Sequence, residues 1–257
     1  MVSAPVFLGD TVLLAKAGVG RPLHLSGPEG RHAGVVQRRD VGERIDVVDG
    51  EGRRACGRIS AVTADGVEII VDELVMEAQP SPRILLVQAL AKGDRDELAI
   101  EAATEVGVDG VVPWQAERSI VVWRGDRAAK SRARWAATVR TATKQSRRAR
   151  VPDVEEPCDT SGLATRAARP GTVMIVLHEE ATDGLVEVVA AAMSADEAAA
   201  TEVLLVVGPE GGISDREVDK LTAAGARLAR LGPHVLRTST AGPVAIALLS
   251  HGLGRWA

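Results

Sequence analysis

The chain has 257 residues and a formal net charge of −4, with 31 Lys and Arg against 35 Asp and Glu. This length favours two domains, and the acidic balance excludes a general polycation, so any affinity for nucleic acid must come from a local patch. Cys56 and Cys158 stand far apart and no histidine pair has metal-ligand spacing, so we expect a reducing compartment, no disulfide and no metal. We find no signal peptide and no apolar run of the ~18–20 residues that a membrane span needs. We therefore expect a cytoplasmic protein without membrane contact.

Short strands predominate in the first part of the chain. The segments 44–48 and 57–62 flank Asp49-Gly50-Glu51-Gly52, which is a hairpin signal. A further strand is predicted over 66–71, after an Asp-Gly turn. Short strands at this spacing indicate a small β-barrel, and a short helix over 29–38 is predicted to plug one end of it.

The pattern changes after a linker at residues 79–82, where two prolines oppose regular structure. We therefore place one domain at residues 1–76 and a second at 77–257. In the second domain apolar strands alternate with amphipathic helices, which predicts an α/β fold with a parallel sheet covered on both faces. The predicted strands are 84–90, 110–114, 173–177, 203–207 and 228–231, and the predicted helices are 94–106, 127–146, 185–193, 214–224 and 240–253.

Two glycine-containing loops follow neighbouring strands near the C-terminus. Gly208-Pro209-Glu210-Gly211-Gly212 comes after a buried strand and leads to Ser214, which forms a capping-box pattern with Glu217. A strand, a glycine loop and a helix N-terminus together are typical of a small-molecule site in α/β proteins. The second loop, over 231–241, follows the next strand. Neither loop has the P-loop or G-x-G-x-x-G pattern, which argues against a nucleoside triphosphate or NAD.

The segment from Arg124 to Arg150 contains ten Lys and Arg residues and a single acid, Asp126. In a helix its apolar residues share one face, and its cations occupy the rest of the circumference. This pattern fits either a solvated helix face or a phosphate-binding surface, and its one-sidedness favours the second. Because aromatic residues are scarce, we expect recognition of a structured RNA through its backbone. The candidate RNA-binding residues are Arg118, Arg140, Lys144, Arg147, Arg148 and Arg150.

The order of these motifs resembles the RsmE family, which are SPOUT-class methyltransferases that use S-adenosylmethionine to methylate N3 of a uridine in 16S ribosomal RNA. The resemblance rests on the two glycine-containing loops, and Thr104–Val108, Glu117–Ser119 and 145–152 agree with it. It implies an N-terminal PUA-like barrel that binds RNA, and a SPOUT-type parallel sheet with a C-terminal trefoil knot. It also implies a homodimer, with 16S ribosomal RNA or the 30S subunit as partner.

The resemblance further implies that S-adenosylmethionine lies against the backbone of the glycine-containing loops. The residues expected to form its site are Leu177, His178, Gly208, Glu210, Gly211, Gly212, Leu231, Gly232, Val235, Leu236, Thr238, Ser239 and Ala241. Ser239 departs from the family, which usually has Glu there, and Ala102 and Lys144 replace Lys and Glu.

Three residues are candidates for catalysis. Arg237 would stabilise negative charge on the uracil as N3 loses its proton, or would form a salt bridge that fixes its loop. Arg118 would contact a phosphate or the base of the target, or would likewise form a structural salt bridge. Glu210 would accept a proton or bind the donor's amine, or would only place a charge near a helix N-terminus.

Two other functions remain open. The first is a knotted methyltransferase that acts on another RNA, either on tRNA or on a 2′-hydroxyl. The second is a non-catalytic ribosome-assembly factor that binds RNA. The loss of the family's Glu at Ser239 favours it, and the intact loop Gly208–Gly212 argues against it, because a pure binder need not keep a cofactor pocket.

Overall fold

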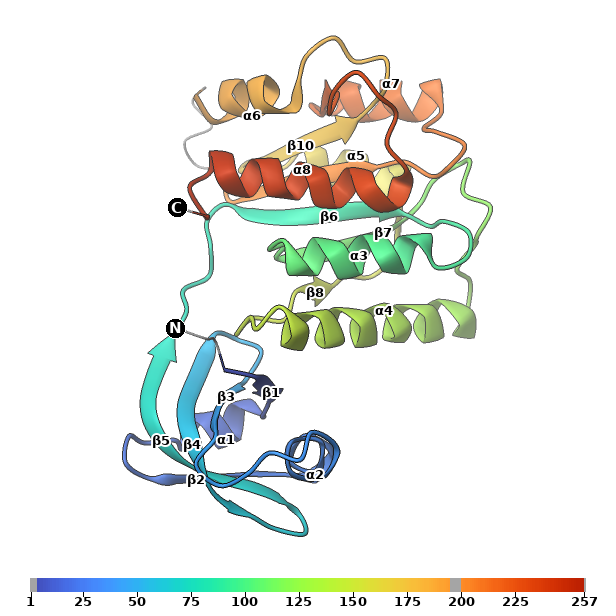
Figure 1. Cartoon of the computed structure of the whole chain (residues 1–257). Helices are drawn as coiled ribbons and strands as arrows, with labels where there is room; N and C mark the ends of the chain where they lie inside the picture. Colours follow the sequence, from blue (N-terminus) through green and yellow to red (C-terminus); the bar gives the residue numbers. More distant parts are fainter. Residues whose placement is uncertain (1–3, 195–199, 257) are drawn as a thin grey trace. The chain divides into compact units, whose positions relative to one another are not determined.

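The structure is a computed structural model that describes residues 4–194 and 200–256. The chain divides into two compact units (Figure 1). Unit 1 comprises Met1–Gln79 and Arg140–Val151, and unit 2 comprises Pro80–Val139 and Pro152–Ala257. The units are therefore not separated by a single cut near residue 76, because a later segment belongs with the N-terminal residues.

Unit 1 contains β1 (Val6–Leu8), α1 (Thr11–Ala15), β2 (Pro22–Ser26), α2 (Gly27–Arg31), the π-helix η1 (His32–Val36), β3 (Arg44–Val48), β4 (Arg53–Val62) and β5 (Gly66–Met76). Its five strands form one sheet in the order β1-β3-β4-β5-β2. β1 pairs with β3 in parallel, and the other neighbours are antiparallel. Aliphatic side chains and Phe7 form the core of this unit.

The predicted hairpin of unit 1 is confirmed, since β3 and β4 pair in antiparallel register across the turn. The predicted strand over 66–71 is also present and continues to Met76. A helical segment is present where one was predicted over 29–38, but it runs from Gly27 to Val36 and changes from α to π geometry. α2 ends at Arg31, a π-helical turn follows, and the backbone then leaves the helix through Arg38 in the left-handed region (φ 51°). π-helical turns are rare, and the 3.6-residue pattern does not indicate them.

The segment 140–151 belongs with unit 1 because it makes polar and apolar contacts there. Lys144 Nζ lies 2.8 Å from Glu29 Oε1. Ala149 is buried against residues of β1 and β3. The backbone N–H of Val151 donates to Gly50 O at 2.9 Å. These contacts fix the end of the basic segment on the small sheet.

Unit 2 contains β6 (Arg83–Ala89), α3 (Arg95–Glu105), β7 (Gly110–Gln115), β8 (Asp153–Val154), β9 (Cys158–Asp159), α5 (Thr160–Ala167), β10 (Thr172–Leu177), α6 (Leu185–Ser194), β11 (Glu202–Val207), α7 (Asp215–Ala223), β12 (Arg227–Ala229) and α8 (Thr238–Gly252). The helix α4 (Asp126–Gln145) begins in unit 2 and ends in unit 1. The sheet has the order β12-β10-β11-β6-β7-β8, with β9 also paired to β7, and all these pairs are parallel.

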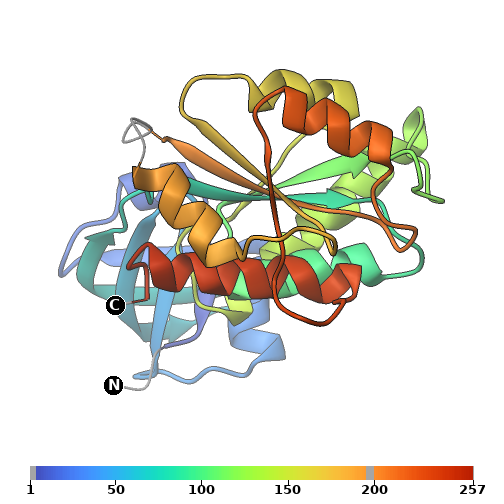
Figure 2. The ribbon, with the colours of Figure 1, turned by 90° about the horizontal axis from the view of Figure 1, so that it is seen from above.

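Helices cover both faces of this sheet, as a view from above shows (Figure 2). α5 and α7 lie on one face, while α3, α6 and α8 lie on the other. The predicted α/β fold with a parallel sheet is therefore confirmed. α5, β8 and β9 were not predicted from the sequence. β8 and β9 have only two residues each, which is too short for a strand pattern to be visible. Within the described residues, no helix is long and apolar enough to cross a membrane.

α8 packs closely on the sheet through a glycine. A Cβ built on Gly242 would lie 2.8 Å from Leu86 Cδ1 in β6, which is closer than side-chain carbons tolerate. Near the end of the same helix, a Cβ on Gly252 would meet nothing within 4 Å. The glycine at position 242 thus allows α8, whose first turn borders the carboxyl edge of the sheet, to approach the central strands.

We expect Gly242→Ala to destabilise the protein by about 1–3 kcal/mol, because the added methyl overpacks the interface between α8 and β6. Gly252→Ala is the matched control and should leave the stability unchanged or raise it by about 0.4–1 kcal/mol. Urea unfolding followed by circular dichroism measures both. Equal unfolding midpoints for the two variants would contradict the close packing.

Candidate active site

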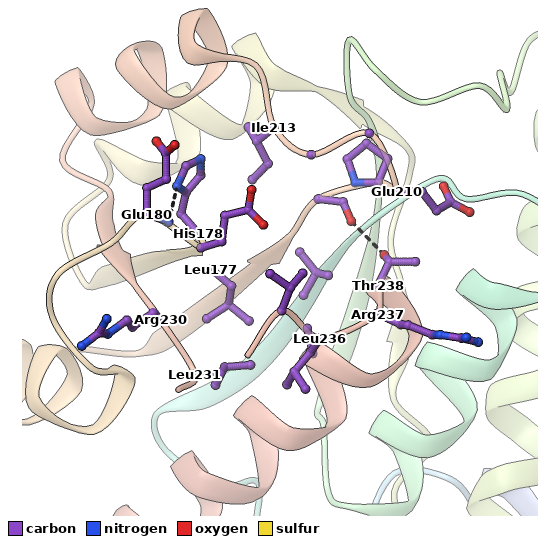
Figure 3. A pocket seen from close by; sticks show the side chains of 18 of the residues that line it. Leu177, His178, Glu180, Glu210, Ile213, Arg230, Leu231, Leu236, Arg237 and Thr238 are labelled. Atoms are coloured by element: carbon purple, nitrogen blue, oxygen red, sulfur yellow. Dashed lines mark hydrogen bonds between the residues drawn. The ribbon is translucent and has the colours of Figure 1, made fainter. Parts of the chain in front are cut away.

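A cavity of about 700 Å³ opens at the carboxyl edge of the parallel sheet in unit 2 (Figure 3). Open parallel sheets bind ligands at this edge, and the volume is in the range of small-molecule sites. The cavity is lined by Arg95, Arg118, Leu177, His178, Glu179, Glu180, Val207, Gly208, Pro209, Glu210, Gly211, Gly212, Ile213, Asp215, Arg230, Leu231, Gly232, Pro233, His234, Val235, Leu236, Arg237, Thr238 and Ala241.

The glycine loop after β11 forms one wall of this cavity and is tied to the start of α8. Thr238 Oγ1 donates to Gly208 O at 2.8 Å and accepts from Gln88 Nε2 at 2.9 Å. A Cβ on Gly208 would lie 2.7 Å from Ile213 Cγ1, and Gly212 has a φ of +73°. Side chains are thus disfavoured at both glycines, and the loop presents bare backbone to the cavity.

Apolar side chains form the opposite part of the wall. Leu177 from the end of β10 lies close to Leu231 and Leu236 from the loop between β12 and α8 (Figure 3). Val235 is 76% exposed although it is apolar. Bare backbone groups beside an apolar wall suit a ligand with a flat ring and polar edges. The adenosine part of S-adenosylmethionine has this character, so the residues present fit the expected cofactor.

Glu210 joins the glycine loop to the start of α3. Its Oε1 lies 2.7 Å from Arg95 Nη1 and accepts from the backbone N–H of Lys92 at 3.2 Å. Burial alone would raise the pKa of Glu210. Hydrogen bonds from its own backbone N–H, Arg95 and the Lys92 amide outweigh this effect and hold its pKa below the usual value. A carboxylate with a lowered pKa is a weak proton acceptor, and this geometry favours an anchoring role.

The start of α3 also contains a buried acidic residue. Asp96 is 2% exposed, and burial raises its pKa to about 6 against the opposing hydrogen bonds from the amides of Glu97 and Ala91. The first turn of α3 therefore contains a carboxyl group that is partly protonated near pH 6.

The two candidate catalytic arginines have different environments. Arg118 Nη1 donates to Gly211 O at 3.1 Å, so its guanidinium supports the glycine loop. Arg237 is the N-cap residue of α8 and is exposed, and we find no hydrogen bond or ion pair of its guanidinium among the described residues. Its side chain extends away from Leu177 and Leu231 (Figure 3). Arg237 thus has a cationic head available for a second ligand.

The remaining cofactor candidates gather at the same place, with one exception. Ser239 is half-buried in the first turn of α8 and does not line the cavity. His178 lines it and accepts from the backbone N–H of Glu180 through Nδ1 at 3.3 Å (Figure 3). Sequence reasoning missed Arg95 and Arg230. Arg95 follows β6 and Arg230 follows β12 at the same edge of the sheet, which was the available signal.

The predicted RNA-binding residues are divided between the units. Lys144 pairs with Glu29, and the guanidinium of Arg150 donates to Glu77 O and Gln79 Oε1. Arg140 is exposed on α4. Arg147 is exposed in the left-handed region (φ 59°), and its carbonyl accepts from Arg54. In the described part of the chain, no group of three or more His, Cys, Asp or Glu residues is arranged to hold a metal ion.

Comparison with known proteins identifies the family. A family model described as an RNA methyltransferase domain matches residues 78–250. Ribosomal RNA small subunit methyltransferase E of Mycobacterium bovis is 43% identical over 235 residues, which cover 90% of this chain and 87% of that protein. The protein of the same name from Bacillus subtilis is 31% identical and covers 88% of this chain and 89% of its own length. This chain belongs to the RsmE family.

A solved structure of the RsmE family supports the same fold. It is a ribosomal RNA small subunit methyltransferase E from Neisseria gonorrhoeae bound to S-adenosyl methionine. It aligns with a TM-score of 0.79 and 26% identity, over 97% of this chain and 98% of that chain.

In this RsmE-family chain a buried carboxylate organises the cavity wall. Glu217 is 1% exposed. Its Oε1 accepts from the backbone N–H of Glu117 at 3.0 Å and from Thr160 Oγ1 at 2.6 Å. Its Oε2 accepts from the backbone N–H of Ser214 at 3.2 Å. The Ser214 hydroxyl, 3.2 Å from the same oxygen, donates its proton to Glu117 Oε2 at 2.7 Å. The predicted capping box is confirmed. The carboxylate also joins the loops after β7 and β11, which places Arg118 beside Gly211.

We expect Glu217→Gln to weaken the binding of S-adenosylmethionine, the ligand of the gonococcal relative, by about tenfold. Each carboxylate oxygen accepts from a backbone N–H, so in either orientation the Gln amide N–H₂ faces a donor, and a buried unsatisfied group costs about 1–3 kcal/mol. Isothermal titration measures the affinity. Asp219→Asn, on the exposed side of the same helix, is the control. Unchanged affinity in Glu217→Gln would show that the hydrogen bonds of Glu217 do not determine the geometry of the cavity.

Proposed function

We propose that this protein transfers a methyl group from S-adenosylmethionine to N3 of a specific uridine in the 16S ribosomal RNA of the small subunit. The observation that carries the proposal is the match along 90% of the chain to a relative named ribosomal RNA small subunit methyltransferase E. The cavity at the carboxyl edge of the sheet supports it, because its bare backbone and apolar wall fit the donor.

The residues proposed to hold the donor are those that line this cavity. Backbone groups of Gly208, Gly211 and Gly212 would face its polar edges, and Leu177, Leu231 and Leu236 would pack against its ring. When bound, S-adenosylmethionine supplies an activated methyl group on a sulfonium sulfur. The protein contributes alignment of the acceptor nitrogen, and positioning of this kind is worth up to about 7–11 kcal/mol.

Arg237 is proposed to act on the uridine. As N3 loses its proton, negative charge spreads onto the uracil carbonyl oxygens, and a nearby guanidinium stabilises that charge. The exposed head of Arg237 at the cavity supports this role. Glu210 has a lowered pKa and is paired with Arg95, and Ser239 has no carboxylate. The proton therefore passes to solvent or to a group of the substrate.

The RNA is proposed to bind through the exposed cations of unit 1 and α4. The exposed Arg140 and Arg147, together with the half-buried Arg148, would contact phosphates, and contacts of this kind release counterions and make binding depend on salt. Lys144 and Arg150, which were predicted to join them, also hold segment 140–151 on unit 1. The small sheet of unit 1 is proposed to be a PUA-like RNA-binding domain, on the resemblance to the family.

Two further features are proposed from the same resemblance. The first is a deep trefoil knot in the C-terminal part of unit 2, which chains almost never form and which no sequence pattern indicates. The second is a homodimer in the cytoplasm. Light scattering of the purified protein determines the oligomeric state directly.

The reaction is tested by incubating the protein and labelled S-adenosylmethionine with small ribosomal subunits from a strain that lacks uridine-N3 methylation. The RNA is then digested to nucleosides. We expect the label in 3-methyluridine. Label in a 2′-O-methylated nucleoside, or only in added tRNA, would replace the proposed substrate with another RNA target. Measurable donor binding without transfer would favour an assembly factor.

We expect two arginine variants to separate chemistry from RNA binding. Arg237→Ala should lower kcat at least about tenfold, and by about 10²–10³-fold if Arg237 acts as a full charge-stabilising donor, and should leave the salt dependence of RNA binding unchanged. Arg140→Glu should weaken RNA binding and reduce its salt slope, with kcat at saturating RNA intact. Each variant is the control for the other. Turnover that survives Arg237→Ala would remove that residue from the mechanism.

A further inference from the structure

The loop that follows β7 leaves the cavity wall and projects from the carboxyl edge of the sheet (Figures 1 and 2). Its residues alternate in exposure. Ser119 is buried, and Val121 and Trp123 are half-buried, whereas the residues between and beside them are exposed. Residues 117–118 form a turn, closed by the Ser119 N–H that donates to Ala116 O at 3.0 Å, and Ile120 lies at a bend. We call the exposed side chains of Arg118, Ile120, Val122 and Arg124 the outer row of the loop.

This loop is braced from inside by one side chain. Gln115 Nε2 donates to Val121 O at 3.0 Å, and Gln115 Oε1 accepts from the backbone N–H of Trp123 at 3.2 Å. Trp123 packs edge-on against the buried Trp135, with ring centroids 5.1 Å apart. These contacts hold the inner residues, so the outer row is presented by a supported segment.

The outer row is apolar at its centre and cationic on its flank. Ile120 is 65% exposed and Val122 is 45% exposed. Arg124 follows them, and the exposed Arg127 and Lys130 come next on α4. At the other end, Arg118 contacts the glycine loop of the cavity. Exposed branched aliphatic residues bordered by cations match RNA, whose bases are apolar on their faces and whose phosphates are anionic.

We propose that this outer row binds the RNA next to the target nucleotide, with Ile120 and Val122 against an unstacked base and Arg124 near a phosphate. The inference rests on the proposed function. An enzyme that modifies a ring nitrogen must take the base out of its stack, and aliphatic side chains act as wedges between bases in other nucleic-acid-binding proteins. Ile120 lies two residues from the cavity wall, where such a wedge would hold the gap left by the extruded uridine.

The first test is kinetic. Ile120→Ser should lower kcat/KM for small ribosomal subunits about tenfold and leave the Kd for S-adenosylmethionine within twofold. Val186→Ser, at a valine of α6 that is 56% exposed, is the matched control and should change neither value. Arg124→Gln should weaken RNA binding and leave donor binding intact. An unchanged kcat/KM in Ile120→Ser would overturn the proposal.

The second test locates the contact. Ile120→p-benzoylphenylalanine places a photo-reactive group on the outer row, and irradiation in the complex with unmethylated subunits is followed by reverse transcription. Stops within a few nucleotides of the methylated uridine are expected. Cross-links only to a second copy of the protein, or to distant RNA, would overturn the proposal. If the wild-type protein methylates no uridine, the proposed function fails, whereas transfer with no effect at Ile120 removes only this inference.

Discussion

The geometry of the cavity depends on the buried carboxylate of Glu217. Its two oxygens accept hydrogen bonds that come from the loop after β7, from the start of α5 and from the start of α7. A buried carboxylate is tolerated only when its acceptor sites are filled. The three segments are therefore held together, and Arg118 and the glycine loop are positioned as a consequence. The second tie, Thr238 to Gly208 O, then fixes this loop to α8.

The arginines at this edge of the sheet have two different roles. Some hold the glycine loop in place, and one has a guanidinium group that can meet a ligand. Arg118 and Arg95 have their guanidinium groups on the carbonyl of Gly211 and the carboxylate of Glu210. These contacts support the glycine loop and shape the cavity. Arg237 has no such contact among the described residues, and it begins a helix that is tied in place by its neighbour Thr238. An arginine with an unpaired guanidinium group and a fixed backbone is suited to stabilise negative charge that develops only during a reaction.

The fold of unit 2 was predictable because its strands are continuous buried runs, such as Val203–Val207, with helical periodicity between them. The capping box at Ser214 and Glu217 was also predictable from a local pattern, because its two residues are three apart in the sequence. The partners of Arg118, Glu210 and Lys144 lie about a hundred residues away in sequence. No local pattern indicates them. The grouping of residues 140–151 with unit 1 depends on such contacts. The sequence therefore indicated the positive charge of this segment but not the unit to which it belongs.

The scarcity of aromatic residues limits how this protein can hold a base. Phe7, Trp114 and Trp135 are fully buried, and Trp123 is half-buried against Trp135. Among the described residues Trp256 alone has a largely exposed aromatic ring, at 53%, and it lies beyond α8 and does not line the cavity. Among the described residues, no Phe or Trp therefore lines the cavity at the carboxyl edge. The surfaces there for an unstacked base are the imidazoles of His178 and His234, aliphatic side chains and guanidinium planes, and the row from Arg118 to Arg124 combines the last two.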